Sequence, residues 1–311
     1  MESTNHKDFQ ELKVQETAVS IGKFDAIHLG HREIINKLVQ LSRGNALASV
    51  VLTFDRHPNH LLNPESTPTP VIGAQQKREE LELLGVEHLV TLEFDSGIAK
   101  LTPVEFVQEV LLSSLHAKYV VVGSDFRFGS GAEGDVSALK EFGQQFGFEV
   151  EVMEKLKSKG LEISTSAIRN ALLQGQVAEA AELLGRNHST VGIVVHGLKN
   201  GRKLGYPTAN IARDAEGMLP KDGVYAGWLY AGENKYMAAI SVGTNESVTA
   251  VPRVLEAHVL DRDDLDLYDQ VVKVEYVDLI RPNLKFSGID ELVTQIGLDV
   301  ESARSILTNL G

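Results

Sequence analysis

Hydrophobic and polar positions follow two different rhythms along this chain, and the change comes near Gly185. Before it, short β-branched runs alternate with stretches in which apolar residues recur every three or four positions, as in amphipathic helices. Strands are predicted over residues 18–21, 49–54, 88–92, 119–122 and 149–153, and helices over residues 30–43, 75–84, 103–115 and 136–146. This alternation favours a parallel sheet with helices on both faces, whose ligands lie in the turns after the strands.

After Gly185 the period changes to two, which is typical of half-buried strands. Five strands are predicted, over residues 190–196, 224–230, 237–242, 254–260 and 271–279. Such a set with glycine-containing connections indicates an antiparallel barrel or a sandwich, and the pattern alone leaves both open. Helices are expected over residues 289–296 and 300–310. We therefore predict two domains, residues 1–185 and 186–311.

Composition narrows the possible functions. The chain has 311 residues, a net charge of −13 and no cysteine. The missing thiols exclude disulfides and thiolate metal sites, and the acidic balance disfavours binding to a nucleic-acid backbone. No apolar run approaches the roughly 18 residues of a membrane span, and the first residues do not resemble a signal peptide. We expect a cytoplasmic protein with small-molecule partners and no nucleic-acid or membrane partner, and its oligomeric state stays open.

The turn after the first strand contains two histidines around a glycine, in the segment GKFDAIHLGH of residues 22–31. His28 and His31 at a helix N-terminus can donate hydrogen bonds to phosphate oxygens, while the helix dipole favours negative charge. The placement favours attack at an α-phosphate with pyrophosphate leaving. The alternative is a polar surface turn, and a zinc site shared with His57 and His60 is a rival, although all-histidine tetrahedral sites are uncommon.

A second turn, GSDFRFGSG of residues 123–131, follows the strand 119–122. Its glycines permit a close backbone approach, Phe126 and Phe128 offer aromatic faces, and Asp125 and Arg127 offer polar contacts. We interpret it as a ligand loop. The alternative is that both phenylalanines only plug the edge of the sheet.

Three consecutive hydroxyl residues open a further helix in the segment ISTSAIRN of residues 163–170. This is an ordinary N-terminal cap taken alone. Beside Arg169, Ser164 and Thr165 also suit a phosphate cradle, and the histidine turn earlier in the chain favours that interpretation.

The first strand of the second half leads into a loop rich in glycine and basic residues that ends in Pro-Thr-Ala-Asn, residues 196–210. It suits a flexible cover over a triphosphate, with Thr208 and Asn210 offering neutral oxygens to Mg²⁺. It lacks the Gly-Lys-Ser/Thr ending of a Walker A motif. Without further context it would be a solvated basic hairpin.

Four segments of the first half, GKFDAIHLGH, TFDRHP, VVVGSDFRFG and ISTSAIR, occur in an order and spacing that match one family. In the second half, GYPTAN (205–210) and RVLEAHVLD (253–261) match the same family. The chain resembles bacterial bifunctional riboflavin kinase/FMN adenylyltransferase over nearly its whole length. The resemblance implies a Rossmann-like nucleotidylyltransferase domain followed by a six-stranded antiparallel barrel with C-terminal helices. It also implies a transferase that makes FMN from riboflavin and FAD from FMN, using ATP and Mg²⁺.

The resemblance implies a role for each matching residue. Glu256 is the general base of the kinase step, and His28 and His31 are the catalytic pair of the adenylyl transfer. Thr208 and Asn210 hold Mg²⁺. The implied flavin contacts are His57, Asp125, Phe126 and Phe128. The implied nucleotide and phosphate contacts are Gly22, Phe24, Asp25, His28, Gly30, His31, Ser164, Thr165, Arg169, Gly201, Lys203, Gly205, Thr208 and Asn210.

The chain departs from the family pattern at a few positions. Ala26 replaces a usual glycine, Arg56 a usual proline, and Glu246-Ser247 a usual Pro-Thr, while Thr165-Ser166 reverses a common order. Alanine at position 26 costs stability only if φ is positive or a phosphate passes close. Glu246 adds a carboxylate near the nucleotide's phosphates. Two alternatives follow: an enzyme with one competent half, or a flavin-binding regulator without turnover.

Overall fold

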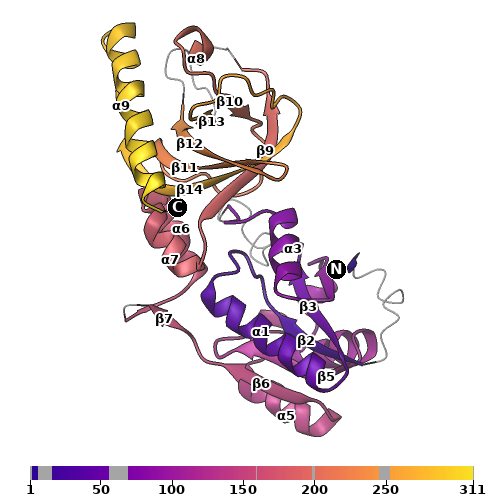
Figure 1. Cartoon of the computed structure of the whole chain (residues 1–311). Coiled ribbons are helices and arrows are strands. Elements are labelled where there is room, and N and C mark those ends of the chain that lie inside the picture. Colours follow the sequence, from indigo (N-terminus) through magenta and orange to yellow (C-terminus); the bar gives the residue numbers. More distant parts are fainter. Residues whose placement is uncertain are drawn as a thin grey trace. The chain divides into compact units, whose positions relative to one another are not determined.

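The computed structural model describes residues 2–5, 16–55, 69–158, 160–197, 200–244 and 253–310 (Figure 1). The chain forms two compact units, one of Met1–Thr69 with Lys77–Ile163 and the other of Pro70–Gln76 with Ser164–Gly311. The predicted domain boundary at residue 185 differs from this division of the chain, and it stays a prediction. None of the helices within the described ranges is long and apolar enough to cross a membrane.

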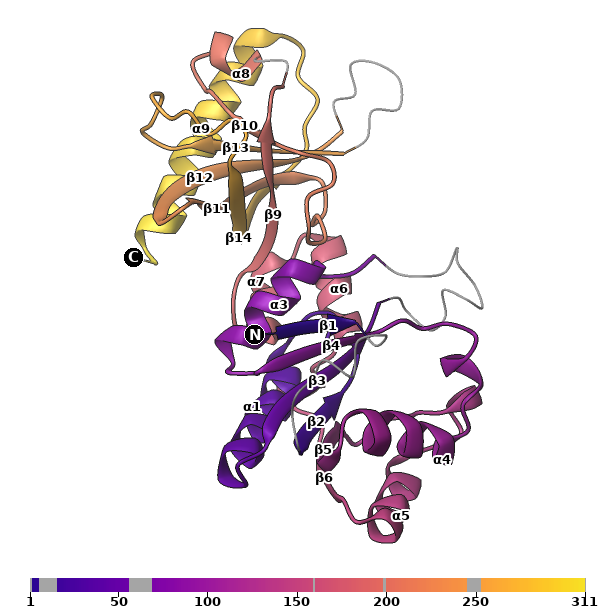
Figure 2. The ribbon, with the colours of Figure 1, turned by 90° about the vertical axis from the view of Figure 1, so that its right-hand side faces the viewer.

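The first unit is built on the predicted parallel sheet (Figure 2). The strand order is β1-β4-β3-β2-β5-β6, and every neighbouring pair is parallel. The strands are β1 (Glu2–Asn5), β2 (Thr17–Ile21), β3 (Ala48–Phe54), β4 (His88–Leu92), β5 (Ala117–Gly123) and β6 (Glu149–Met153). The pattern predicted all of them except β1, whose four residues ESTN are polar or charged and carry no hydrophobic signal.

Helices cover both faces of this sheet. They are α1 (Leu29–Gly44), α3 (Ala74–Leu83, which begins in the other unit), α4 (Pro103–Glu105) continued by η4 (Phe106–Ser114), and α5 (Val136–Phe146). Short elements are η3 (Ile98–Lys100), η5 (Ser130–Ala132) and the hairpin of β7 (Lys157–Ser158) with β8 (Leu161–Glu162). One sheet face packs on η4 and α5, with Val19, Val120 and Phe106 in a common core, and α1 packs on the opposite side.

The helix predicted over residues 103–115 differs in detail. Only its first turn is α-helical, and η4 is a π-helix, closed by the Leu115 N–H donating to the Val110 carbonyl at 3.1 Å. Hydrophobic period alone cannot distinguish the two windings, because both bring an apolar stripe onto a sheet.

The strand order reverses at β2. From β2 the chain proceeds to β3 and β4 on one side, and then returns to β5 and β6 on the other. Ligands of such sheets bind at this switch point, beyond the carboxyl ends of the strands. The histidine turn follows β2 and the Asp125 turn follows its neighbour β5, so both predicted ligand turns lie at the switch point.

The second unit is a closed antiparallel barrel with strand order β10-β13-β12-β11-β14-β9, which settles the choice between barrel and sandwich. Its strands are β9 (His188–Val195), β10 (Ala209–Ile211), β11 (Gly223–Ala231), β12 (Asn234–Gly243), β13 (Val254–Val259) and β14 (Val271–Pro282). Five of these were expected from the pattern. The sixth, β10, has three residues, too few to show a period, and it closes the barrel between β13 and β9.

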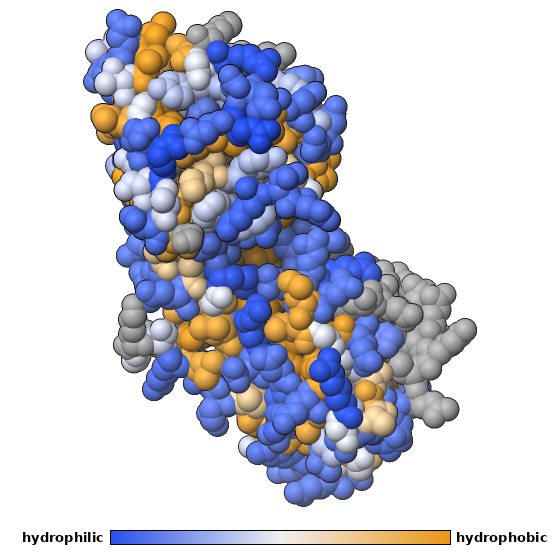
Figure 3. Space-filling model, in the orientation of Figure 1, coloured by the Kyte–Doolittle hydropathy of each residue, from blue (hydrophilic) through white to orange (hydrophobic). Residues whose placement is uncertain are grey.

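Among the residues that the structure describes, the helices that lie wholly in the second unit are α6 (Thr165–Gln174), α7 (Val177–Leu184), α8 (Asn200–Lys203) and α9 (Ile289–Thr308). The prediction of two C-terminal helices is wrong, because α9 is continuous through Gly297. A β-carbon at Gly297 would lie 3.3 Å from the Tyr206 hydroxyl, so the glycine marks a close approach and not a break. The face in Figure 3 is mostly hydrophilic, with apolar residues in scattered groups.

Candidate active sites

The turn between β2 and α1 is held in an unusual backbone conformation. Phe24 and Ile27 have φ of 45° and 43°, in the left-handed region that non-glycine residues rarely adopt. Both side chains are buried, with exposures of 1% and 0%, so packing maintains the strain. Ala26 is also fully buried, and its φ is not positive. The backbone cost that we considered for alanine at this position therefore does not arise.

The two histidines form one structural unit at the start of α1. His28 is the N-cap, and its Nδ1 accepts a hydrogen bond from the His31 N–H at 3.2 Å. The two imidazole rings are stacked, with centroids 3.7 Å apart and planes 13° apart. Because Nδ1 of His28 is an acceptor, the proton of its neutral ring lies on Nε2. His28 thus caps the helix through Nδ1 and carries its ring proton on Nε2.

Gly30 makes this stack possible. A β-carbon at Gly30 would lie 3.2 Å from Cε1 and 3.3 Å from Nδ1 of His28. Such contacts are tighter than most, and the His28 ring would have to move away. The glycine between the histidines therefore leaves room for the His28 ring, and its own φ, which is not positive, does not call for glycine.

His31 is kept neutral by its surroundings. Burial lowers its pKa well below the ordinary value, and the neighbouring His28 and Lys77 lower it further. Lys77, on α3, donates from Nζ to the Lys23 carbonyl at 2.8 Å. Burial also lowers the pKa of Lys77, while Asp25 opposes that shift. A cation thus lies next to the histidine pair, where a phosphate would be favoured.

The other predicted residues of this turn support the histidines. The ring of Phe24 packs edge-on against His31 with centroids 5.2 Å apart, and being buried it contributes through packing. A β-carbon at Gly22 would lie 3.0 Å from that ring, so Gly22 leaves room for it. Asp25 is half-buried, and its negative charge attracts the ammonium group of Lys77.

The turn after β5 has a polar and an apolar side. Asp125 Oδ2 forms an ion pair with Lys155 Nζ at 3.1 Å. Phe126 and Phe128 stack with centroids 5.5 Å apart, but Phe128 is only 6% exposed and belongs to the core, where it meets Phe106. The plug interpretation therefore fits Phe128. Phe126 is half-buried and retains an accessible part.

The hydroxyl residues at the start of α6 belong to the second unit. Ser164 is the N-cap, and its Oγ accepts from the Ala167 N–H at 3.2 Å. The ordinary capping role is therefore confirmed. Thr165 occupies the first turn, and Arg169 lies half-buried one turn later. Their phosphate-binding role stays a prediction.

Some predicted positions lie outside the described residues. These are Arg56, His57, His60, Glu246 and Ser247. The flavin contact expected of His57, the zinc alternative and the effect of Glu246 all stay predictions.

In the second unit, the Pro-Thr-Ala-Asn segment lies against β13. Asn210 on β10 pairs with Glu256 on β13, and the Thr208 hydroxyl donates to Glu256 Oε2 at 3.1 Å. Asn210 Nδ2 makes long contacts of 3.4 Å to the carbonyl and hydroxyl of Thr208. The structure thus brings together the three chemistry-bearing residues that the sequence singled out. Glu256 is half-buried and hydrogen-bonded, and it is not a carboxylate free in solvent.

The basic loop before this segment contains α8. Gly201 permits a close approach, because a β-carbon there would lie 2.4 Å from the Tyr206 carbonyl oxygen. Lys203 ends α8, and its side chain is outside the described part of the chain. Gly205 follows with a φ of 87°, which glycine adopts without strain.

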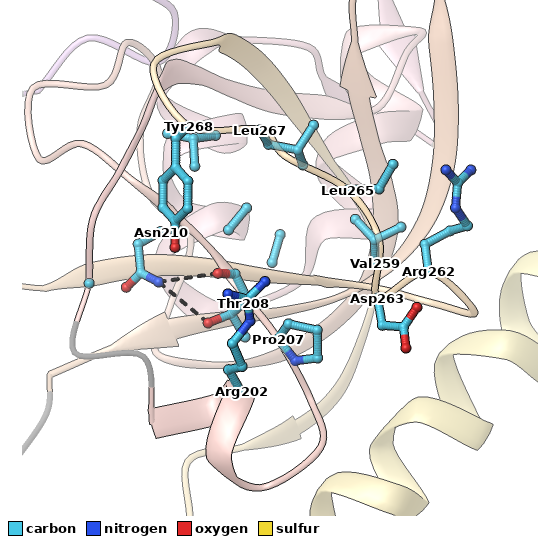
Figure 4. Close-up of a pocket in the computed structure, with 14 residues that line it drawn as sticks. Arg202, Pro207, Thr208, Asn210, Val259, Arg262, Asp263, Leu265, Leu267 and Tyr268 are labelled. Atoms are coloured by element: carbon cyan, nitrogen blue, oxygen red, sulfur yellow. Dashed lines mark hydrogen bonds between the residues drawn. The ribbon is translucent and has the colours of Figure 1, made fainter.

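A pocket opens beside this segment (Figure 4). Arg202, Thr208 and Asn210 gather on one side of it, and Leu267 and Tyr268 lie on the other. Its volume is about 60 Å³. Pockets that enclose a whole small molecule usually measure about 300–1,000 Å³, so this pocket is too small to enclose one completely. Glu256 does not line it and reaches it through Thr208.

Two residues near these sites were missed by the sequence patterns. Lys77 lies on a predicted helix 46 positions beyond His31, and nothing in its own neighbourhood marks it as a ligand residue. His258 lies two residues after Glu256 on the same strand, and the period of two could have placed both on one face.

Comparison with known proteins agrees with the geometry. A family model described as FAD synthetase matches residues 10–167, and one described as riboflavin kinase matches residues 184–307. A bifunctional riboflavin kinase/FMN adenylyltransferase of Buchnera aphidicola subsp. Schizaphis graminum is 35% identical, with 92% of each chain covered. The chain belongs to the bifunctional riboflavin kinase/FMN adenylyltransferase family.

Further relatives match this chain at similar sequence identity over nearly its whole length. The bifunctional riboflavin kinase/FMN adenylyltransferase of Escherichia coli strain K12 is 34% identical, covering 92% of this chain and 91% of its own. The Listeria monocytogenes enzyme of the same name is 32% identical, covering 94% and 93%. A solved structure described as a macrolide-efflux protein from Streptococcus pneumoniae superposes with a TM-score of 0.89 at 32% identity, covering 98% of this chain and 99% of that one.

Proposed function

We propose that the two sites described above carry the two reactions of the family. The chain is a transferase that phosphorylates riboflavin with ATP to FMN, and adenylylates FMN with a second ATP to FAD, releasing pyrophosphate. The observation that carries the assignment of sites is their separation in the fold. The stacked histidine pair follows a strand of the parallel sheet, and the Thr208–Glu256 pair lies on the barrel.

In the kinase site, Glu256 acts as the general base. Its carboxylate accepts the proton of the riboflavin 5′-hydroxyl as that oxygen attacks the γ-phosphorus of ATP, and ADP leaves. The Thr208 hydroxyl lies 3.1 Å from Glu256 Oε2 and so can hold this carboxylate in one orientation. Kinase chemistry is mainly positioning and charge neutralisation, and one oriented carboxylate is sufficient for the proton.

The same group of side chains fits Mg²⁺. Hydroxyl, amide and carboxylate oxygens are the ligands that this cation prefers, and it binds proteins through few of them while keeping several waters. We propose that Thr208 and Asn210 hold it, and that when bound it neutralises charge on the ATP phosphates. We propose that Arg202, which lines the pocket, contacts phosphate oxygens together with the backbone of Gly201, Lys203 and Gly205.

In the adenylyl-transfer site, His28 and His31 bind the ATP phosphates as neutral donors. The N-terminus of α1 adds its free N–H groups and the helix dipole. An oxygen of the FMN phosphate attacks the α-phosphorus, and the two imidazoles, which donate hydrogen bonds to the phosphates, stabilise the negative charge that passes to pyrophosphate. Lys77 supplies the nearby positive charge.

The remaining assignments are also proposals. His57, Asp125 and the accessible part of Phe126 contact the flavin, and Ser164, Thr165 and Arg169 contact phosphate through the start of α6. Because ATP and flavins are intracellular substrates and the net charge is −13, we propose a cytoplasmic enzyme without a nucleic-acid or membrane partner.

A crossed pair of variants tests the two sites. The parent chain, Glu256→Gln, and the double variant His28→Ala with His31→Ala are each assayed for FMN formation from riboflavin and for FAD formation from FMN. Glu256→Gln keeps the side-chain shape but removes the proton acceptor, so kcat for FMN formation should fall by about 10²–10⁴-fold with little change in KM. Its FAD formation should stay unchanged.

The histidine double variant should show the reverse pattern, with FAD formation lost and FMN formation retained. Loss of both activities in a folded variant would contradict the assignment of one reaction to each site. A parent that makes FMN but no FAD, or FAD but no FMN, would favour the alternative with one competent half. No turnover in either assay would favour the flavin-binding regulator.

A further inference from the structure

His258 is a polar residue on the same face of β13 as Glu256, and no role has been given to it so far. On this strand Leu255, Ala257 and Val259 are buried, whereas Glu256 and His258 are half-buried on the other face. His258 Nδ1 lies 2.8 Å from the carbonyl oxygen of Pro207. A carbonyl can only accept, so the ring must donate from Nδ1.

The hydrogen bond between His258 and Pro207 lies just beyond the last backbone pairing of β10 with β13. The pairing of β10 with β13 runs from Ile211 through Asn210 to Ala209 and ends there. Residues 207 and 208 therefore lack the ladder hydrogen bonds that fix the strand. The His258 ring spans this point and holds the Pro207–Thr208 peptide beside β13. The Thr208 hydroxyl, part of the next residue, then meets Glu256 at 3.1 Å.

Other contacts hold the His258 ring itself. The ring of Tyr206 meets it edge-on, with centroids 5.4 Å apart and planes 80° apart. Tyr206 is in turn fixed by its N–H, which donates to the Gly201 carbonyl at 2.9 Å, and by its packing with the α9 core. The donor is thus pre-oriented, as expected of a group that orients another.

We propose that His258 is a positioning residue for the kinase step, whose Nδ1–H fixes the Pro207 carbonyl and thereby sets the Thr208 hydroxyl against Glu256. This inference rests on the proposed role of Glu256 and Thr208. Removing the His258 donor lets residues 207–208 move. The Thr208 hydroxyl then contacts Glu256 in only a fraction of the molecules. Partners of this kind usually affect activity or metal affinity by about 10–100-fold.

Asparagine and glutamine provide a matched test. The amide nitrogen of asparagine reaches approximately the position of histidine Nδ1, whereas that of glutamine reaches the position of Nε2. Both variants are neutral and polar at a half-buried site. We expect His258→Asn to keep most of the FMN-forming activity. His258→Gln and His258→Leu should lose about 10–100-fold in kcat/KM.

Three further measurements accompany the assay. Calorimetric binding of MgADP should weaken for the glutamine and leucine variants and be preserved for the asparagine variant. FAD formation from FMN, which takes place at the other site, should be unchanged in all three. Unfolding followed by the fluorescence of Trp228, the single tryptophan, which lies in the barrel, shows whether each variant is folded.

The outcomes separate this inference from the proposed function. If folded His258→Gln and His258→Asn lose activity equally, or if His258→Leu is as active as the parent, the positioning role is wrong while the kinase assignment stands. If Glu256→Gln keeps full FMN formation, the assignment of the base is wrong whatever the histidine variants do. Should the leucine variant fail to fold, the asparagine–glutamine pair decides alone.

Discussion

The stability of the barrel unit should depend on a single buried histidine. His188 begins β9, is only 1% exposed, and stacks on Tyr276 with ring centroids 5.8 Å apart. Its Nε2 donates to the Met218 carbonyl at 2.6 Å, and its Nδ1 has no partner among the residues that the structure describes. A second proton would enter at Nδ1 without an acceptor. The native state therefore disfavours the charged ring.

The pKa of His188 expresses this cost. Burial lowers it to about 4, the Met218 hydrogen bond opposes the shift, and the positive charge of Arg186 adds to it. An unfolded chain has a histidine pKa of about 6.5. Above that pH His188 is unprotonated in both the folded and the unfolded state, and it does not lower the free energy of unfolding. As the pH falls from about 6.5 towards 4, only the unfolded state takes up the proton, and the free energy of unfolding decreases.

The loss can be worked out from the two pKa values. Each pH unit inside this window costs about 1.4 kcal/mol, so the barrel should lose about 2 kcal/mol between pH 7 and pH 5 from this one residue. Below pH 4 the contribution should reach a plateau near 3 kcal/mol, since both states are then protonated. This is a large part of the roughly 5–15 kcal/mol that stabilises a typical domain.

Urea unfolding followed by Trp228 fluorescence measures this in the full chain, because the single tryptophan lies on β11 of the barrel. His188→Gln is the matched variant, since its amide can donate to Met218 but does not titrate. Other groups titrate equally in both proteins. The stability of the parent should therefore fall by about 2 kcal/mol more than that of the variant between pH 7 and pH 5. Parallel pH profiles would refute the reasoning.

Three further predictions concern the catalytic sites. Gly30→Ala should displace the His28 ring, which a β-carbon would approach to 3.2 Å, and lower kcat/KM for FAD formation by about tenfold while FMN formation stays constant; an unchanged FAD rate would show that the stack is not needed. The chain should hold no tightly bound zinc, and stoichiometric zinc after dialysis into metal-free buffer would contradict this. Glu246→Pro with Ser247→Thr should raise FMN formation, because the family pattern implies that these changes remove a carboxylate near the phosphates; no gain would mean that the departure is tolerated.

Much of the architecture follows from local patterns. Residues 48–54 are mostly apolar because a parallel strand is buried on both faces, and α1 carries a single apolar stripe because only one side meets the sheet. The parallel sheet and most of its helices could therefore be predicted from period alone. The composition of one loop singled out Thr208 and Asn210 as well, and the family resemblance singled out Glu256.

Other features could not be predicted, because they depend on partners that are distant in the sequence. β10 is a strand only because β13 and β9 offer their edges to it, and Gly297 lies inside α9 where the Tyr206 hydroxyl approaches the helix. A period reports which side of an element is buried, but not what covers it. For the same reason it left barrel and sandwich undecided.

The chain by itself determined which residue types stand at the ends of its strands, and thus the chemistry that is available. The tertiary structure decided the protonation and the orientation of these side chains. His31 is neutral because α3 brings Lys77 and burial to it, and its ring stacks on His28 because Gly30 leaves space. The Thr208 hydroxyl meets Glu256 because β13, 48 positions away, lies beside it. Charge, orientation and desolvation arise from such contacts through space, and these are properties of the folded chain alone.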